Sequence, residues 1–232
     1  MNGPEVDALE AQCEELSALI ADLGDDDWSR PSRCDGWSVK ELVAHCEGMM
    51  LRLVGANIEP VEGPAESDRV GYYGYDPDGP REGEDPSKTF SEHIRDRVID
   101  EAGDRSADEL RESLEGAVDG MIAKVRELPA DRVIKRSGHP KLTFGEFVAT
   151  RVLEFGVHSM DISHATLRGE KVHPAAVPVI TGILDGLLGA KLPKSIGWDP
   201  RTYILTGTGR RHLLSNERYA LGPLAEKFPL LR

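Results

Sequence analysis

Residues 143–168 have the spacing of a helix whose apolar face carries groups able to hold a metal ion. On a helical wheel, Arg151 and His158 fall inside the apolar stripe, and Glu154 and Asp161 flank its edge. Burial of a charged group is costly unless the group is paired or coordinates a metal. Because Glu154 and His158 are one helical turn apart, their side chains can converge on one ion.

A third ligand can come from His45, which lies at the border of the apolar stripe of the helix predicted over residues 38–53. His45, Glu154 and His158 together offer two nitrogens and one carboxylate. That set suits Zn²⁺ with one open position, as in catalytic zinc sites. The alternative is that the two histidines are only hydrogen-bonded, because short Glu-x-x-x-His spacings also occur without a metal.

The two remaining polar groups of this helix have predicted roles beside the metal. Arg151 can bind a substrate carboxylate through two parallel N–H groups, or it can form a salt bridge with Glu154 or Asp161. Asp161 is predicted to lie behind the ligands and hold one tautomer of a histidine. Cys46 is expected to be a small core residue. Cys34 lies in a loop in which nothing nearby indicates activation.

Several helices must position these side chains. Apolar residues recur at steps of three and four in a first helix, and pairs of Ser or Thr with Glu three residues later form capping boxes at Ser38, Ser106 and Thr143. The predicted helical segments are residues 5–23, 38–53, 87–102, 106–128 and 143–168. With four long helices among these five segments and long crossovers between some of them, we predict a four-helix bundle rather than an α/β sheet.

Two other segments differ from the bundle. Residues 59–86 hold five Pro, five Gly and nine acidic residues around Tyr72, Tyr73 and Tyr75. This composition predicts a long loop, which is either a solvated connection or a lid whose tyrosines cover a pocket. Residues 174–192 predict an apolar helix with Pro174 in its first turn. Residues 202–206 predict a strand followed by a Gly-Thr-Gly turn, with a second short strand possible at 212–214.

The composition excludes several classes of protein. The 232 residues include 28 Lys and Arg against 41 Asp and Glu, a formal net charge of −13. Such a balance argues against binding to nucleic acid or anionic lipid. No apolar run reaches the roughly 18 residues of a membrane span, and we expect no secretory signal. Three cysteines do not suggest a disulfide framework. We therefore expect a cytoplasmic protein.

Two signatures resemble one known family. The stretch from Trp28 to His45, WSRPSRCDGWSVKELVAH, is similar to the N-terminal signature of the mycothiol-dependent maleylpyruvate isomerase family. The later order of Arg151, Glu154, His158 and Asp161 resembles the second signature of that family. The resemblance implies a mainly α fold, with a DinB-like metal-binding bundle over residues 1–168 and a short α+β extension over 169–232.

The resemblance also implies a function. A divalent metal, with zinc expected, would be held by His45, Glu154 and His158, and mycothiol would act as cosubstrate or cofactor. The expected activity is thiol S-transfer to a small electrophile, or its thiol-assisted isomerisation. The expected partners are small molecules, and the chain is expected to be a monomer or homodimer. A zinc hydrolase and a non-catalytic metal- or thiol-binding module stay open as alternatives.

Overall fold

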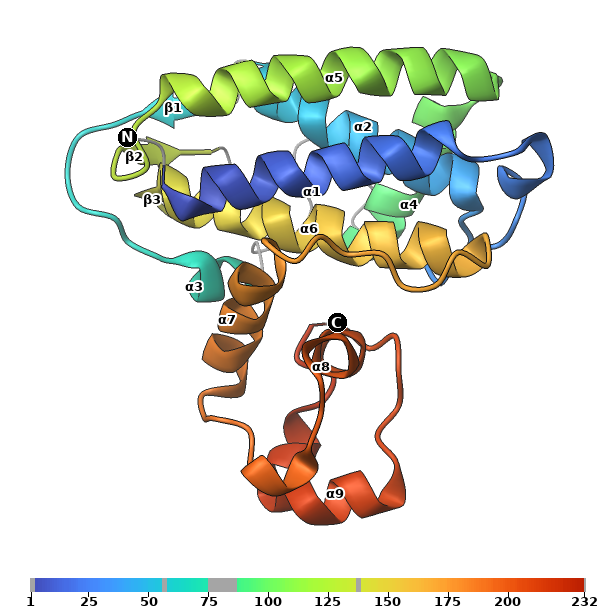
Figure 1. Ribbon diagram of the computed structural model, residues 1–232. Coiled ribbons are helices and arrows are strands. Elements are labelled where there is room, and N and C mark those ends of the chain that lie inside the picture. Colours follow the sequence, from blue (N-terminus) through green and yellow to red (C-terminus); the bar gives the residue numbers. More distant parts are fainter. Residues whose placement is uncertain (1–2, 56–57, 75–86, 137–138, 232) are drawn as a thin grey trace.

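The computed structural model describes residues 3–55, 58–74, 87–136 and 139–231, and most of them are helical (Figure 1). The helices of the first part of the chain are α1 (Pro4–Ala21), α2 (Val39–Val54), α3 (Arg69–Gly74), α4 (Phe90–Ala102), α5 (Ala107–Glu127) and α6 (Phe144–Ala165). Its short strands are β1 (Glu59–Pro60), β2 (Val133–Lys135) and β3 (Leu142–Thr143). The C-terminal part contains α7 (Val177–Leu188), α8 (Pro200–Gly207) and α9 (Ser215–Leu221).

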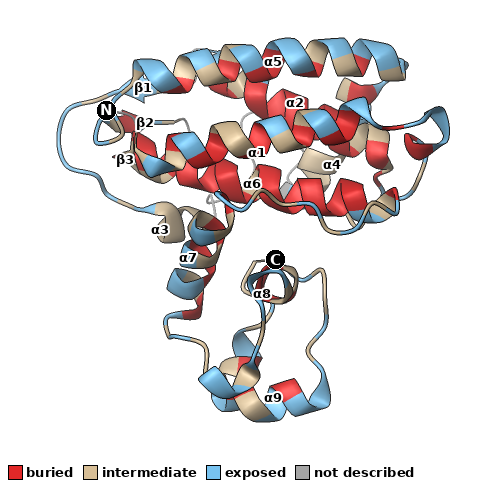
Figure 2. Cartoon of the chain, viewed as in Figure 1, coloured by how far each residue is buried: buried red, intermediate tan, exposed pale blue. Residues whose placement is uncertain are grey.

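The predicted four-helix bundle is confirmed. Helices α1 and α2 each contact both α5 and α6, so these four helices enclose a common core, and α4 packs against the outer side of α2. Helix α6 is the central element, and almost its entire length is buried (Figure 2). An α-helix that is apolar on nearly all sides belongs in a protein interior, so polar groups on α6 lie among core residues.

Two of the three predicted capping boxes form completely. The backbone N–H of Ser106 donates to the carboxylate of Glu109 at 2.7 Å, and Ser38 and Glu41 make the equivalent contacts before α2. At the start of α6, Thr143 accepts the N–H of Glu146, but the Glu146 carboxylate binds Arg69 instead of returning to Thr143. A tertiary ion pair has replaced half of the third box.

The interpretation of residues 59–86 as a loop throughout is wrong for its first half. Residues 59–60 form β1, which pairs antiparallel with β2, and β2 pairs with β3. Residues 69–74 form the six-residue helix α3, whose first turn is capped by Asp68. Tyr75 and the rest of the predicted loop, residues 75–86, lie outside the described residues.

The strands predicted in the C-terminal part are also wrong. Residues 202–206 lie within α8, and residues 212–214 form neither helix nor strand. The side chain of Asp199 accepts the N–H of Thr202 at 2.7 Å, and Pro200 occupies the first turn. The hydroxyl of Thr206 donates to the carbonyl of Thr202 at 2.7 Å. Capping by Asp199 therefore outweighs the β propensity of these residues.

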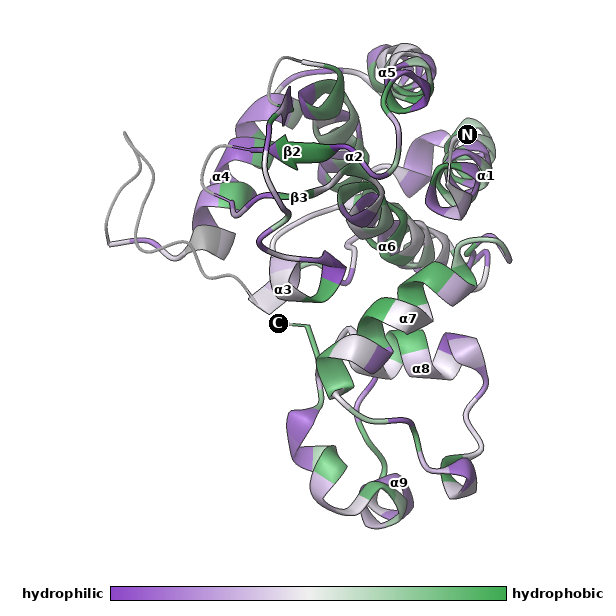
Figure 3. Ribbon diagram, turned by 90° about the vertical axis from the view of Figure 1, so that its left-hand side faces the viewer, coloured by the Kyte–Doolittle hydropathy of each residue, from purple (hydrophilic) through white to green (hydrophobic). Residues whose placement is uncertain are grey.

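Helix α7 connects the bundle to the C-terminal helices. It begins at Val177, with Pro178 in its first turn, rather than at the predicted Pro174. Its strongly apolar sequence packs against α6, α3 and α8 (Figure 3). The part of the chain that the structure describes contains no helix with the length and apolar character of a membrane span.

Candidate functional site

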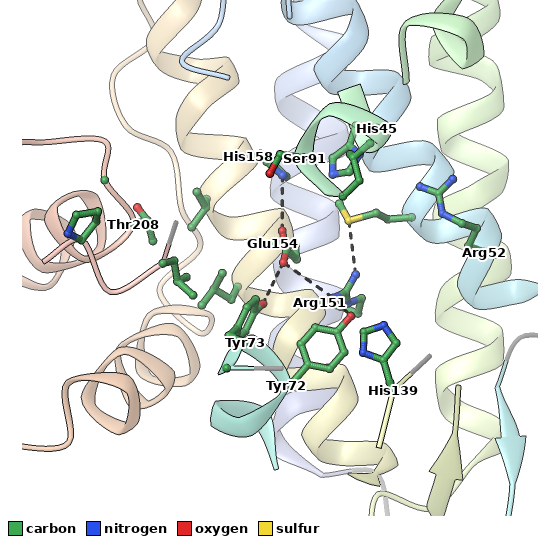
Figure 4. A pocket seen from close by; sticks show the side chains of 18 of the residues that line it. His45, Arg52, Tyr72, Tyr73, Ser91, His139, Arg151, Glu154, His158 and Thr208 are labelled. Atoms are coloured by element: carbon green, nitrogen blue, oxygen red, sulfur yellow. Dashed lines mark hydrogen bonds and ion pairs between the residues drawn. The ribbon is translucent and has the colours of Figure 1, made fainter. Parts of the chain in front are cut away.

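A cavity of about 840 Å³ opens between the bundle, α3 and the C-terminal segment (Figure 4). Its wall includes four of the five residues singled out from the sequence, namely His45, Arg151, Glu154 and His158. Asp161, the fifth, is fully buried behind His158. The helical spacing therefore placed the residues of α6 on the correct side of the helix.

Glu154 and His158 face each other as their spacing predicts. Nε2 of His158 lies 3.7 Å from Oε2 of Glu154, and the ring of His45 lies edge-on to that of His158 at a centroid distance of 5.1 Å. The two imidazoles are buried, and the Glu154 side chain is 24% exposed toward the cavity. Glu154 is thus a neighbour of His158, and the ring of His45 contacts that of His158. The role of the three residues as metal ligands stays a prediction.

His45 has an unusual environment for a buried histidine. Among the described residues its Nδ1 has no hydrogen-bond partner. Burial, with the positive charges of Arg52 and Arg151 nearby, lowers the pKa of His45 well below its ordinary value. The side chain is therefore a neutral imidazole with an unused nitrogen, which is the form that binds metals.

His158 and Asp161 form a buried pair. Nδ1 of His158 lies 3.4 Å from Oδ2 of Asp161, and two nitrogens of Arg210 contact the same carboxylate at 2.9 and 3.2 Å. Burial raises the pKa of Asp161, but the hydrogen bond with His158 and the charge of Arg210 outweigh it and lower that pKa. Asp161 thus fixes the orientation of the His158 ring, with Nε2 turned toward Glu154.

A second set of donor atoms shares His158. Ligand atoms of Cys34, His158 and Asp161 lie within 4.8 Å of one another, and the Cys34 thiol is 3.7 Å from the Asp161 carboxylate. This cluster is tighter than the predicted one. However, Asp161 already accepts hydrogen bonds from Arg210 at 2.9 and 3.2 Å. Among the described residues, Glu154 has only the longer ion pair with Arg151, at 4.0 Å, and Nδ1 of His45 has no hydrogen-bond partner. Sequence reasoning missed this position of Cys34 because the loop approaches α6 only in the folded chain.

The other end of the cavity is rich in cationic and aromatic groups. The hydroxyl of Tyr72 accepts hydrogen bonds from Arg136 at 3.1 Å and from Arg151 at 3.2 Å, and its ring stacks on His139 at 4.9 Å. Arg151 is 8% exposed, and its Nη2 lies 4.0 Å from Glu154, at the outer limit of an ion pair. His139 itself also lines the cavity.

Tyr73 completes the wall beside Glu154. Its hydroxyl lies 3.1 Å from Oε1 of Glu154 and 3.0 Å from the carbonyl of Thr150 (Figure 4). Burial and the nearby Glu154 raise the pKa of Tyr73 well above its ordinary value, so the phenol keeps its proton. Tyr72 and Tyr73 therefore line a pocket, which agrees with the lid alternative for this segment; Tyr75 lies outside the described residues.

The comparisons with known proteins identify the family. The chain matches the model of the mycothiol maleylpyruvate isomerase N-terminal domain over residues 9–163. It belongs to that family.

Two solved structures are similar to this chain in fold. Two crystal structures of the mycothiol-dependent maleylpyruvate isomerase, one of them a histidine-to-alanine mutant, match with a TM-score of 0.51. The matches cover 82% and 83% of this chain and 70% and 71% of the others, at 15% and 16% identity. Identity at this level shows the fold alone. A comparison with curated proteins gives no match.

Proposed function

We propose that this family member is a metal-dependent enzyme that uses mycothiol, or a related low-molecular-weight thiol, on a small electrophile. The reaction would be S-transfer to the electrophile or its thiol-assisted isomerisation. One observation carries the proposal: two buried imidazoles and a half-buried carboxylate meet at the wall of a cavity large enough for two small molecules. Membership of the family adds the thiol.

The residues present fit a divalent metal ion, with zinc expected. His45, Glu154 and His158 would hold it, leaving one position open toward the cavity. The unused Nδ1 of buried His45 supports this fit, since a buried polar atom without a partner is costly unless a ligand satisfies it. When bound, such an ion supplies Lewis acidity that lowers the pKa of a thiol approaching it.

The chain's own groups have defined tasks in this scheme. Asp161 accepts the Nδ1 proton of His158 and so leaves the Nε2 lone pair for the ion. The thiol would lose its proton and its sulfur would add to a conjugated double bond of the substrate, giving an enolate that can rotate about the former double bond. Expulsion of the thiolate then restores the double bond in the isomer, whereas return of the proton to the enolate carbon leaves the thioether as the transfer product. The apolar walls formed by Met49, Leu153 and Val157 limit water around the reacting atoms.

Arg151 is proposed to bind a carboxylate of the electrophile. Its guanidinium is buried, its distance to Glu154 is long, and Asp161 pairs with Arg210 rather than with Arg151. Among the described residues, the ion pair of this buried cation with Glu154 is at the outer limit of distance, so a ligand carboxylate would be a closer counterion. The salt bridge with Glu154 stays the alternative role of Arg151.

The remaining assignments are also proposals. We place the boundary of the metal-binding bundle at residue 168, with the C-terminal segment 169–232 contributing Arg210 and Thr208 to the cavity wall. We further propose a cytoplasmic monomer or homodimer.

The test is to purify the protein without chelator, measure its metal content, and follow thiol consumption with a conjugated keto acid as electrophile. About one zinc ion per chain with metal-dependent loss of thiol or isomerisation of the acid is expected. Metal with thiol-independent cleavage of esters or amides would replace the proposal by a hydrolase. Metal and thiol binding without turnover would leave a binding module.

A further inference from the structure

The contact between Tyr73 and Glu154 bridges two segments 81 residues apart in the chain. Figure 4 shows the phenol of Tyr73 pointing at the carboxylate from the opposite side to His158. The two oxygens of Glu154 therefore have separate neighbours. Oε1 lies 3.1 Å from the Tyr73 hydroxyl, and Oε2 lies 3.7 Å from Nε2 of His158.

The Tyr73 hydroxyl has one proton and two acceptors within reach. The carbonyl of Thr150, at 3.0 Å, is also in position to accept the N–H of Glu154 within α6, four residues later. The Glu154 carboxylate carries a charge, and hydrogen bonds to charged acceptors are roughly twice as strong as neutral ones. The Tyr73 hydroxyl therefore donates its hydrogen bond preferentially to Oε1 of Glu154.

Helix α3 holds Tyr73 in place although it is too short to be stable by itself. It has six residues, and each of them is at least partly exposed to solvent. Arg69, its first residue, donates to both carboxylate oxygens of Glu146 at 2.7 Å and to Glu5 at 2.8 Å. These ion pairs bind α3 to α6 and α1, and so fix the distance from Tyr73 to Glu154.

We propose that Tyr73 is a positioning residue for the metal centre: it binds Oε1 of Glu154 so that Oε2 faces the ion beside His158. This inference rests on the proposed metal site and assigns no role in the reaction to the phenol itself. A carboxylate ligand with one oxygen already hydrogen-bonded has lost rotational freedom before the ion arrives. Loss of such an outer partner typically weakens metal affinity by roughly 10–100-fold.

The experiment compares Tyr73→Phe with Tyr203→Phe. Both changes remove one hydroxyl, and Tyr203, which is not among the residues that line the cavity, donates to Asp185 at 3.0 Å within the C-terminal segment. Zinc affinity is measured by competition with a chromophoric chelator, the visible spectrum of the Co²⁺-loaded protein reports ligand geometry, and a thermal melt reports folding. We expect Tyr73→Phe to bind zinc about tenfold or more weakly with a shifted Co²⁺ spectrum, and Tyr203→Phe to change neither.

A double-mutant cycle with Arg69→Ala tests the route through α3. Arg69→Ala should weaken zinc binding in the native background and add little in the Tyr73→Phe background, because both changes act on the same contact. Equal zinc affinity and an unchanged Co²⁺ spectrum for Tyr73→Phe and the unmodified protein would overturn the role of Tyr73 alone. Absence of zinc binding by the unmodified protein would overturn the metal site and with it the proposed function.

Discussion

Two sets of donor atoms share His158, and three single substitutions decide which set holds the metal. His45→Ala removes a donor of the proposed set only, Cys34→Ser removes a donor of the tighter cluster only, and Asp161→Asn touches both in different ways. The side chains of His45, Cys34 and Asp161 all lie next to His158. Differences in zinc affinity between the three variants therefore report which set of donor atoms holds the ion, and not how far each side chain is from it.

The expected loss of zinc affinity depends on whether each substitution removes a ligand, an outer partner of a ligand, or neither. Structural zinc sites with four ligands bind with about 10–16 kcal/mol, or roughly 2.5–4 kcal/mol per ligand. At about 1.4 kcal/mol for each factor of ten, His45→Ala should weaken zinc binding by roughly 60–700-fold. Asp161→Asn keeps all three ligands and loses the charge behind His158, so roughly 10–100-fold is expected. Cys34→Ser should change the affinity by no more than about twofold, since it is not a ligand in the proposed set.

The assay is chelator competition at one pH, with the melting temperature of the metal-free protein measured beside it. His45→Ala should lower that temperature only through the packing that its ring loses against Trp37 and His158, because among the described residues Nδ1 of His45 makes no hydrogen bond that could be lost. The reasoning is refuted if Cys34→Ser abolishes zinc binding while His45→Ala retains it. It is also refuted if His158→Ala binds zinc normally and unfolds at a much lower temperature.

Three further outcomes are expected. Arg151→Gln should raise the KM for a carboxylate-bearing electrophile by roughly 10–100-fold in steady-state kinetics. Its zinc affinity in chelator competition should stay unchanged. An unchanged KM would contradict the anion-binding role of Arg151. Glu47→Gln should lower stability by roughly 1.5–3 kcal/mol in urea unfolding without affecting zinc, because the buried Glu47 carboxylate accepts two hydrogen bonds from Arg105 at 2.6 and 2.8 Å. The hydrogen bonds from Arg211 lower the pKa of Glu217 from 4.5 to about 2, so its stabilisation is present above about pH 4.5 and is lost as the pH falls toward 2. Melts at pH 7 and pH 3 should show a gap between the native protein and Glu217→Gln that narrows in acid, and a constant gap would argue against this pair.

The helices of the bundle and the face of α6 that carries the site could be predicted from local information alone. Apolar residues at helical spacing define which side of a helix is buried, and Ser106 with Glu109 marks a helix start through contacts only three residues apart. The same spacing places Arg151, Glu154 and His158 on neighbouring faces of one helix. These features depend on the geometry of a single element, which is the same in any α-helix.

The partners of those side chains were decided by the tertiary structure. Tyr73 reaches Glu154 from a segment whose composition indicated only a loop, and α3 is helical there because Arg69 finds Glu146 and Glu5 on other helices. Helix α8 formed where β propensity predicted a strand, and the segment after it brings Arg210 to Asp161. Such contacts join groups that are tens of residues apart, and their free energy exists only once the bundle has brought the segments together. The bundle and the face of α6 predicted to bind a metal thus follow from the amino-acid sequence alone. The cluster of Cys34, His158 and Asp161, the cationic end of the cavity and the hydrogen bond from Tyr73 to Glu154 become visible only in the folded chain.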